Sequence, residues 1–311
     1  MADPSPKILH LRTKAEAPPA FPRFSGSPNP AKLIAIAQAL KGYDLVVTHG
    51  WAAINVAMAH KVFAQHLDLP PLFHQEGGGP DFEASEGRLK RKIIRRIALG
   101  SVHTLVAPVK AIGDFATKNW GVPEARIATV QPGIDLKRYR PSAMPDALPG
   151  LVKRSTESWI GAFLTPASAN APAELVHSLV DLPRDWHLVL IAGDTPSDAI
   201  RAVAETHELS NRVHLLSGAA DEAKALALCD IYVECAGRYE YAPGTMKAMA
   251  AGTPVVTFGI GDITTDLERF IEDPEGRKKA GSANRDHALA NFDQAASKRA
   301  LNGLYEAAIT P

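Results

Sequence analysis

The stretch that decides the fold is Arg238-Tyr-Glu-Tyr-Ala-Pro-Gly-Thr-Met-Lys-Ala-Met-Ala-Ala-Gly-Thr-Pro-Val-Val256. Glu240 stands ahead of a Pro-Gly-Thr turn, the turn opens a helix of small residues, and a Gly-Thr-Pro break leads into an apolar strand. The first turn of a helix offers unpaired backbone N–H groups and a positive dipole end, which together favour phosphate. The stretch predicts a phosphorylated ligand at Pro243, Gly244 and Thr245, and an ordinary capped helix is the alternative.

Short apolar runs alternate with helical patterns along most of the chain. Several runs are apolar without alternation, which is typical of strands covered on both faces. Asn29 and Pro30 supply a cap and a first-turn proline for a helix running to about Leu40. The expected strands are Lys7–Leu11, Asp44–Thr48, Pro71–His74, His103–Ala107, Ile127–Gln131, Trp159–Phe163, His187–Ala192, Val213–Leu216, Ile231–Glu234 and Pro254–Thr257. This alternation predicts an α/β protein with parallel sheets.

A proline-rich segment, Pro141 to Pro149, marks the expected domain boundary. Five expected strands precede it and five follow it, which predicts two Rossmann-like domains facing each other across a cleft. We expect an N-terminal domain over residues 1–141 and a C-terminal domain over residues 142–311, with the final helix able to pack back on the first domain. Ligands of such sheets bind beyond the carboxyl ends of the strands.

Composition excludes several classes of protein. The 311 residues carry a formal net charge of zero, with 46% apolar and 22% charged residues, so nucleic-acid binding driven by global charge is not expected. Cys229 and Cys235 cannot form a disulfide framework and do not have zinc-site spacing, so we expect buried reduced thiols. The start of the chain lacks a signal-peptide pattern, and no run approaches the ~20 apolar residues of a membrane span. A cytoplasmic protein is the expectation.

Several segments together resemble one enzyme family. Val130-Gln-Pro-Gly-Ile-Asp-Leu-Lys-Arg-Tyr-Arg-Pro141 resembles the hinge signature of retaining glycosyltransferases of the GT-B fold, group 1 type, with Pro132 in place of the usual Asn. The order and spacing of further similar segments strengthen the resemblance. They are Tyr43–Val47, Trp51, His74–Asp81, Arg95–Leu99, Leu188–Asp194, Arg212–Gly218, Cys229–Val233 and Ala248–Val256.

This resemblance implies transfer of a sugar, with retention, from a nucleotide-sugar held by the C-terminal domain. The acceptor, a saccharide or a lipid-linked molecule, would be bound by the N-terminal domain, and no metal or other cofactor is expected. Bacterial cell-surface polysaccharide or glycolipid synthesis is the expected setting. Two alternatives stay open: a catalytically degenerate GT-B protein that binds a sugar, lipid or partner, and another GT-B enzyme such as a nucleotide-sugar epimerase.

The donor-side residues depart from the family pattern. Glu240 takes the place of the first family Glu, near the donor sugar, but Lys247 replaces the second and can meet a phosphate or be solvated. Gly161 stands at the first glycine of the family's C-terminal domain pattern and is a candidate donor-binding residue. Ala162 stands where the family has an Arg, and the family Lys falls near Ala167 or Ser168. Losing two cations from a desolvated leaving-group site weakens charge stabilisation. Arg238 is expected to compensate in part, or to be a surface arginine.

The acceptor-side candidates follow the third expected strand. His74 ends that strand, where a side chain can face the ligand, and we expect it to have a catalytic or sugar-binding role. Glu76 and Asp81 can meet acceptor hydroxyls, and solvated loop acids are the alternative. Gly77 and Gly78 allow close backbone approach. The preceding strand is followed by His49, Gly50 and Trp51, which are expected to border the same site.

The segment from Arg88 to Arg96 is a strong cluster of positive charge. On a helix Leu89, Ile93 and Ile97 form one stripe, flanked by Arg88, Arg91, Lys92, Arg95 and Arg96. One interpretation is a core-packed stripe with a solvated basic rim. The other is peripheral contact with anionic phospholipid at the inner membrane, which would suit a lipid-linked acceptor.

Overall fold

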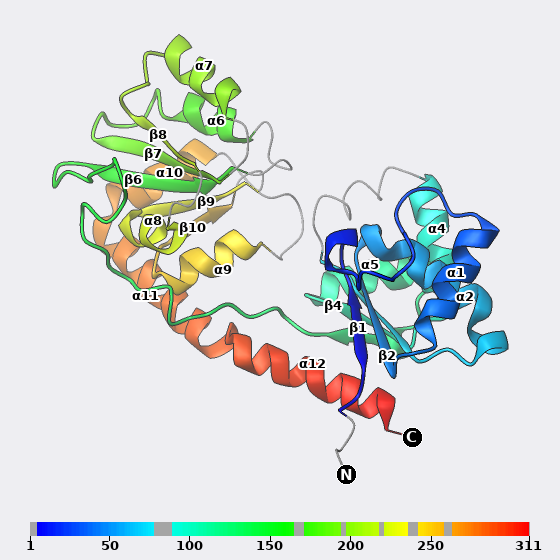
Figure 1. Cartoon of the computed structure of the whole chain (residues 1–311). Helices are drawn as coiled ribbons and strands as arrows, with labels where there is room; N and C mark the ends of the chain where they lie inside the picture. The colour runs from blue at the N-terminus through cyan, green and yellow to red at the C-terminus, as the bar shows by residue number, and fades with distance from the viewer. Residues whose placement is uncertain are drawn as a thin grey trace. The chain divides into compact units, whose positions relative to one another are not determined.

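The structure, a computed structural model, describes residues 5–77, 89–164, 171–193, 197–217, 221–235, 242–257 and 263–310. The chain divides into two compact units, unit 1 with Met1–Pro132 and Ser297–Pro311, and unit 2 with Gly133–Ala296. Each unit is built on a five-stranded parallel sheet (Figure 1), which confirms the predicted α/β class. By this division residues 133–141 belong to unit 2, whereas the proline-rich segment predicts the boundary after residue 141.

In the sheet of unit 1 the strands follow chain order. They are β1 (Ile8–Leu11), β2 (Leu45–His49), β3 (Leu72–Gln75), β4 (Thr104–Ala107) and β5 (Ile127–Thr129). The helices that follow the first four strands are α1 (Pro30–Leu40), α2 (Ile54–Leu67), α4 (Leu89–Leu99) and α5 (Lys110–Trp120). Right-handed crossovers that all step in one direction place their helices on one face of a sheet. The other face therefore needs a different cover.

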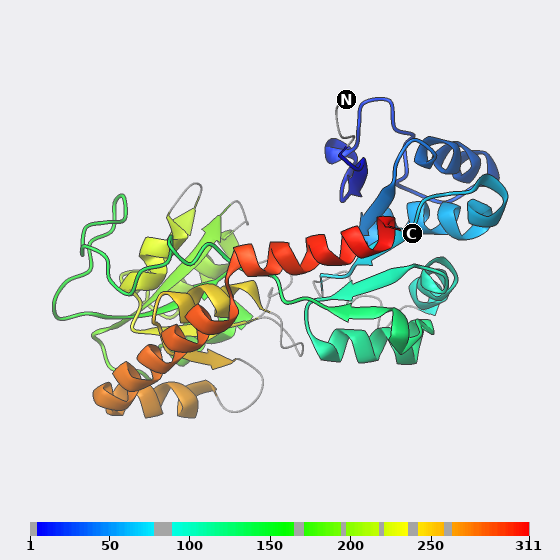
Figure 2. The ribbon, with the colours of Figure 1, turned by 90° about the horizontal axis from the view of Figure 1, so that it is seen from below.

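Helix α12 (Gln294–Ile309) supplies that cover (Figure 2). Its side chains Leu301, Leu304 and Tyr305 pack with Val47 and Phe73 in one apolar cluster. The fully described residues 12–44 form α1 and a short 3-10 helix but no strand, so β1 lies at the sheet edge and the strand order never reverses. The last helix thus covers the face of the first sheet that the crossover helices leave open.

The sheet of unit 2 has the order β10-β9-β6-β7-β8, with β6 in the middle. Its strands are β6 (Ser158–Phe163), β7 (Trp186–Gly193), β8 (Val213–Ser217), β9 (Ile231–Glu234) and β10 (Val255–Thr257). Ile160 and Ala162 belong to one buried cluster, whereas Trp159 belongs to another. Both faces of this sheet are therefore covered, which explains the unbroken apolar runs.

The helices of unit 2 are α6 (Ala171–Ser178), α7 (Asp198–Thr206), α8 (Glu222–Leu228), α9 (Pro243–Ala250), α10 (Ile263–Glu272) and α11 (Pro274–Asn291). In unit 1 the described residues also form three 3-10 helices, which are η1 (Lys14–Glu16), η2 (Trp51–Ala53) and η3 (Glu124–Arg126). Two local predictions are confirmed. The Asn29 side chain accepts the Lys32 N–H at 2.9 Å at the start of α1, and Pro243 occupies the first turn of α9.

Candidate functional site

The carboxyl ends of β6 and β9 form the reversal point of the second sheet. From β6 the chain adds β7 and β8 on one side, and then β9 and β10 on the other. Open α/β sheets bind ligands beyond the strand ends at such a point. A Cβ at Gly244 would lie near Phe163 at the end of β6 and Glu234 at the end of β9, so the first turn of α9 lies at this point.

Glu234 already engages that first turn. Its Oε2 accepts the backbone N–H of Thr245 and the Thr245 hydroxyl, each at 3.1 Å. The Tyr232 hydroxyl donates to the same oxygen at 3.1 Å, and burial raises the pKa of Tyr232 well above its ordinary value, so this phenol stays a neutral donor. An internal carboxylate therefore takes the amide that the sequence assigns to a donor phosphate. The signal for Glu234 was present in the sequence as an acid that ends an apolar strand.

Gly244 is needed for close packing at the same point. A Cβ on this residue would lie 2.0 Å from the Tyr232 hydroxyl oxygen and 2.9 Å from both Glu234 Oε2 and Phe163 Cδ2. These distances are too short for any side chain. The glycine lets the first turn of α9 approach the ends of β6 and β9.

Lys247 is paired within unit 2. Its Nζ donates to Glu222 Oε2 at 2.9 Å and lies 5.2 Å from the centre of the Phe163 ring. Tyr139 donates to the other oxygen of Glu222 at 2.7 Å. Burial works to raise the pKa of Glu222, but the hydrogen bonds from Lys247 and Tyr139 outweigh it and hold that pKa below its ordinary value. Because Lys247 is paired with Glu222, the alternative that it is merely solvated is wrong. A diphosphate would have to compete with Glu222 for the Lys247 ammonium group.

Gly161 lies inside β6, where a Cβ would be 2.5 Å from Cys229 Sγ. The missing side chain thus makes room for a neighbouring thiol, and contact with the donor stays a prediction. Burial raises the pKa of Cys229 to about 12, and that of Cys235 to about 12, so both remain thiols. Both are free and buried, which confirms the expectation for them. Ala162 is fully buried and brings no charge to the site.

Several predicted residues lie outside the described part of the chain. They are the catalytic candidate Glu240, the donor-side Arg238, the acceptor-side Gly78 and Asp81, the positions Ala167 and Ser168, and Arg88 of the basic segment. Their roles stay predictions.

In unit 1 the predicted His74 is fully buried at the end of β3. Its Nδ1 lies 2.9 Å from the Thr48 hydroxyl, and its Nε2 lies 3.5 Å from Glu76 Oε2. Arg95 of α4, also fully buried, approaches the same Glu76 oxygen at 3.4 Å. His74 and Glu76, two residues predicted for the site, therefore lie together, and Arg95 approaches the same carboxylate. One of the two interpretations of the basic segment placed Arg95 on a solvated rim, which is wrong because Arg95 is buried.

Two tryptophan rings enclose the Arg95 guanidinium. Its carbon lies 5.2 Å from the ring centre of Trp51 and 4.9 Å from that of Trp120. Burial works to raise the pKa of Glu76, but hydrogen bonding and charge from His74 and Arg95 outweigh it and lower that pKa. Glu76 is buried and ionised, so the alternative of a solvated loop acid is wrong for it; a contact with acceptor stays a prediction. Gly77, by contrast, is exposed.

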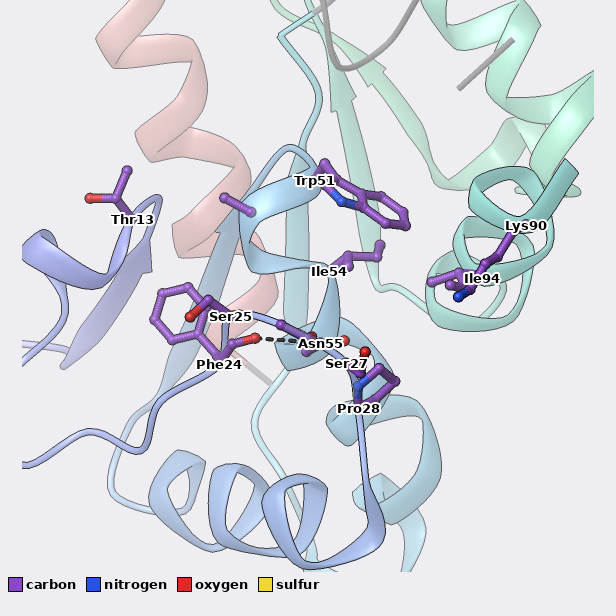
Figure 3. Close-up of a pocket in the computed structure, with 12 residues that line it drawn as sticks. Thr13, Phe24, Ser25, Ser27, Pro28, Trp51, Ile54, Asn55, Lys90 and Ile94 are labelled. Atoms are coloured by element: carbon purple, nitrogen blue, oxygen red, sulfur yellow. Dashed lines mark hydrogen bonds between the residues drawn. The ribbon is translucent and has the colours of Figure 1, made fainter. Parts of the chain in front are cut away.

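A pocket of about 490 Å³ lies beside this cluster in unit 1 (Figure 3). Trp51, Ile54 and Phe24 give it apolar walls, and α4 contributes Lys90 and Ile94. The Asn55 side chain donates to the carbonyls of Phe24 and Gly26, at 2.7 Å each, and so fixes the loop that forms one wall. Trp51 borders this pocket, and the loop in its wall lies after β1. That His49, Gly50 and Trp51 border the ligand site of His74 and Glu76 stays a prediction.

A second polar cluster lies on the opposite face of the same sheet, beneath α12. His10 Nδ1 is 3.3 Å from His49 Nε2, and the Gln75 amide donates to the Tyr305 hydroxyl. Burial, the charge of Arg12 and the neighbouring histidines lower the pKa of His49 to about 3. Burial and Arg12 also lower the pKa of His10. Both rings are therefore neutral near pH 7.

The lowered pKa values of His49 and His10 make the stability of unit 1 depend on pH. A histidine whose folded pKa is below its unfolded value contributes stability that is complete above about pH 6.5 and is lost as the pH falls towards 3. We expect the free energy of unfolding to fall by up to about 1.4 kcal/mol per pH unit from His49 in this window. His49→Gln should flatten the dependence in urea unfolding between about pH 7 and pH 5, whereas His66→Gln on the exposed side of α2 should leave it unchanged. Equal slopes for wild type and His49→Gln would contradict the assignment.

Among the described residues, no group of three or more His, Cys, Asp or Glu side chains is arranged to hold a metal ion. None of the helices that the structure describes is both long and apolar enough to cross a bilayer.

Both halves of the chain match glycosyltransferase domains. Residues 3–138 match the model of Glycosyltransferase Family 4, and residues 159–279 match that of Glycosyl transferases group 1. Each half of the chain therefore carries a glycosyltransferase domain, and the two parallel-sheet units have the architecture of the GT-B fold.

Its relatives are distant. A D-inositol 3-phosphate glycosyltransferase of Streptomyces bingchenggensis is 22% identical over 87% of this chain and 70% of the relative. An MMP alpha-(1->4)-mannosyltransferase of Mycolicibacterium hassiacum is 24% identical over 69% of this chain, and the match spans 56% of the relative.

Solved structures share the fold. Sucrose-phosphate synthase of Thermosynechococcus elongatus superposes with a TM-score of 0.73 at 16% identity, over 96% of this chain and 88% of that chain. Anabaena HepE in complex with UDP superposes with a TM-score of 0.71 at 16% identity, over 89% of this chain and 82% of that chain.

Proposed function

We propose that the protein transfers a sugar, with retention of anomeric configuration, from a nucleotide-sugar bound by unit 2 to a saccharide or lipid-linked acceptor bound by unit 1. The setting we propose is bacterial cell-surface polysaccharide or glycolipid synthesis. The observation that carries the proposal is the first turn of α9 at the reversal point between β6 and β9. The Anabaena neighbour, whose structures contain UDP and UDP-glucose, supports a nucleoside diphosphate as the leaving group.

Charge stabilisation is the chemistry that this site has to provide. Sugar transfer builds positive charge at the anomeric carbon and negative charge on the departing diphosphate. In the proposal the α9 amides and Lys247 meet the diphosphate, whereas Glu240 and His74 act near the transferred sugar. A metal has no assigned role.

The carboxylate of Glu234 gives this proposal a sharp test. It accepts the Thr245 amide, so a diphosphate at the same turn would meet a negative charge close by. We expect Glu234→Gln to keep the hydrogen-bond geometry and to tighten UDP or GDP binding by roughly tenfold, because one repulsive charge is removed. Isothermal titration measures the affinity, and Glu272→Gln, at an exposed residue that ends α10, is the control. Unchanged affinity in Glu234→Gln would place the diphosphate elsewhere.

Activity separates this proposal from a second candidate. The capped α9 turn and the neutral Ala162 favour a degenerate GT-B protein that binds a sugar, lipid or partner without catalysis. An enzyme should slowly hydrolyse nucleotide-sugars without acceptor when several donors are screened. Silence with every donor, together with no thermal shift from any nucleoside diphosphate, would support the binding protein and reject the transferase.

A further inference from the structure

Helix α4 exposes an apolar stripe to solvent. Leu89, Ile93 and Ile97, spaced four residues apart and therefore on one helix face, are 71%, 48% and 48% exposed. The buried side of the helix consists of Arg95, Ala98 and Leu99 instead. The interpretation in which the stripe packs in the core is therefore wrong. Exposed leucine and isoleucine side chains that line up on a surface helix indicate a surface for binding a protein, a membrane or a ligand.

The same face carries positive charge. Lys90 and Arg96 are exposed beside the stripe, and the segment from Leu89 to Leu99 contains no acidic residue. Arg91 differs, because its guanidinium carbon lies 5.0 Å from the Trp51 ring centre. The formal net charge of the chain is zero, so this charge is a local property of α4 rather than of the whole protein.

We propose that this face of α4, formed by Leu89, Lys90, Ile93, Arg96 and Ile97, docks on the surface of a bilayer that contains anionic phospholipid. The apolar side chains enter the boundary between headgroups and acyl chains, and the two cations pair with lipid phosphates. A second copy of the chain fits less well, because two such faces would bring like charges together. Docking goes beyond the proposed transferase function and does not require it.

The pocket of unit 1 lies beside this docking face. Lys90 belongs both to the docking face and to the pocket lining. Ile94, which directly follows Ile93 of the docking face, also lines the pocket. Docking would hold the pocket close to the lipid headgroups. If the proposed function holds, an acceptor carried on a lipid is the substrate class that suits this placement.

Vesicle flotation of the full chain tests the docking. We expect binding to phosphatidylcholine vesicles that contain about a third phosphatidylglycerol, weaker binding in high salt, and little binding to phosphatidylcholine alone. Lys90→Gln with Arg96→Gln should weaken partitioning about 25-fold, since each basic residue at an anionic surface contributes a factor of about five. Leu89→Gln, Ile93→Gln and Ile97→Gln together should weaken it at least about tenfold. Glutamine keeps helix propensity, and thermal unfolding checks that the variants fold.

Matched controls come from exposed residues of unit 2. The charge control is Lys278→Gln with Lys279→Gln, and the apolar control is Met144→Gln, Val180→Gln and Leu289→Gln. Both should bind vesicles as wild type does. The proposal is overturned if wild type does not float with anionic vesicles, or if the α4 variants bind as well as the controls. It is also overturned if those variants abolish a homodimer in sedimentation equilibrium while vesicle binding is absent. UDP titration of the same preparations reports separately on the transferase proposal.

Discussion

Arg95→Met is expected to lower the free energy of unfolding of unit 1 by about 3–5 kcal/mol, because it leaves a buried carboxylate without its cation. Arg95 is fully buried, 3.4 Å from Glu76 Oε2, and Glu76 is itself only 4% exposed. Methionine keeps an apolar stem against the rings of Trp51 and Trp120. The loss therefore reports on the charge rather than on packing volume.

A double variant distinguishes these two causes. Glu76→Gln with Arg95→Met removes both charges and should recover most of the lost stability, since an uncompensated charge costs more than the absent pair. Urea unfolding with hydrogen-exchange mass spectrometry of β3 and α4 peptides assigns the change to unit 1. The folded pKa of Glu76 is lowered from 4.5, so its contribution is present above that pH and lost as the pH falls below it. If the double variant were as unstable as Arg95→Met, lost contact with the tryptophan rings would be the cause.

Gly244→Ala is expected to damage unit 2 locally and to weaken UDP binding at least about tenfold, as the first turn of α9 must shift. The new Cβ would lie 2.0 Å from the Tyr232 hydroxyl oxygen. Overpacking of this kind costs about 1–3 kcal/mol of folding free energy. Isothermal titration and urea unfolding measure the two effects.

Tyr232→Phe offers a rescue, because it removes the oxygen that the new methyl group meets first. The double variant with Gly244→Ala should therefore regain part of both stability and UDP affinity. Gly303→Ala in α12 is the control: apart from the adjacent backbone of its own helix, no atom lies within 4 Å of its added Cβ, and alanine there should stabilise by about 0.4–1 kcal/mol. Wild-type UDP affinity in Gly244→Ala would remove this turn from the donor site.

The sequence predicts the strands of this protein well, because they are apolar runs bounded by polar residues and turns. Each of the ten expected runs overlaps a strand, and β9 has the predicted bounds Ile231–Glu234. Strand order was harder to predict, since neighbours in a sheet depend on which face each crossover takes. The signal in the sequence that the strand order of unit 1 does not reverse was the short region between Leu11 and Tyr43.

The site was less predictable than the fold, because residues distant in sequence decide whether each charged side chain is buried, paired or solvated. Helical periodicity alone shows two sides of α4, and an apolar stripe ordinarily packs inside. Here Arg95 is buried instead, because Trp51, Trp120 and Glu76 converge on it from other elements. The pairing of Lys247 with Glu222 likewise depends on α8 lying beside α9.

The cover that α12 gives the first sheet has a consequence for how the chain is made. When a ribosome has released the strands β1 to β5, the helix that packs on Val47 and Phe73 has not yet been synthesised. Exposed apolar strand faces of this kind promote aggregation of nascent chains. The earliest-made part of the protein is therefore the last to complete its core, after all of unit 2 has emerged.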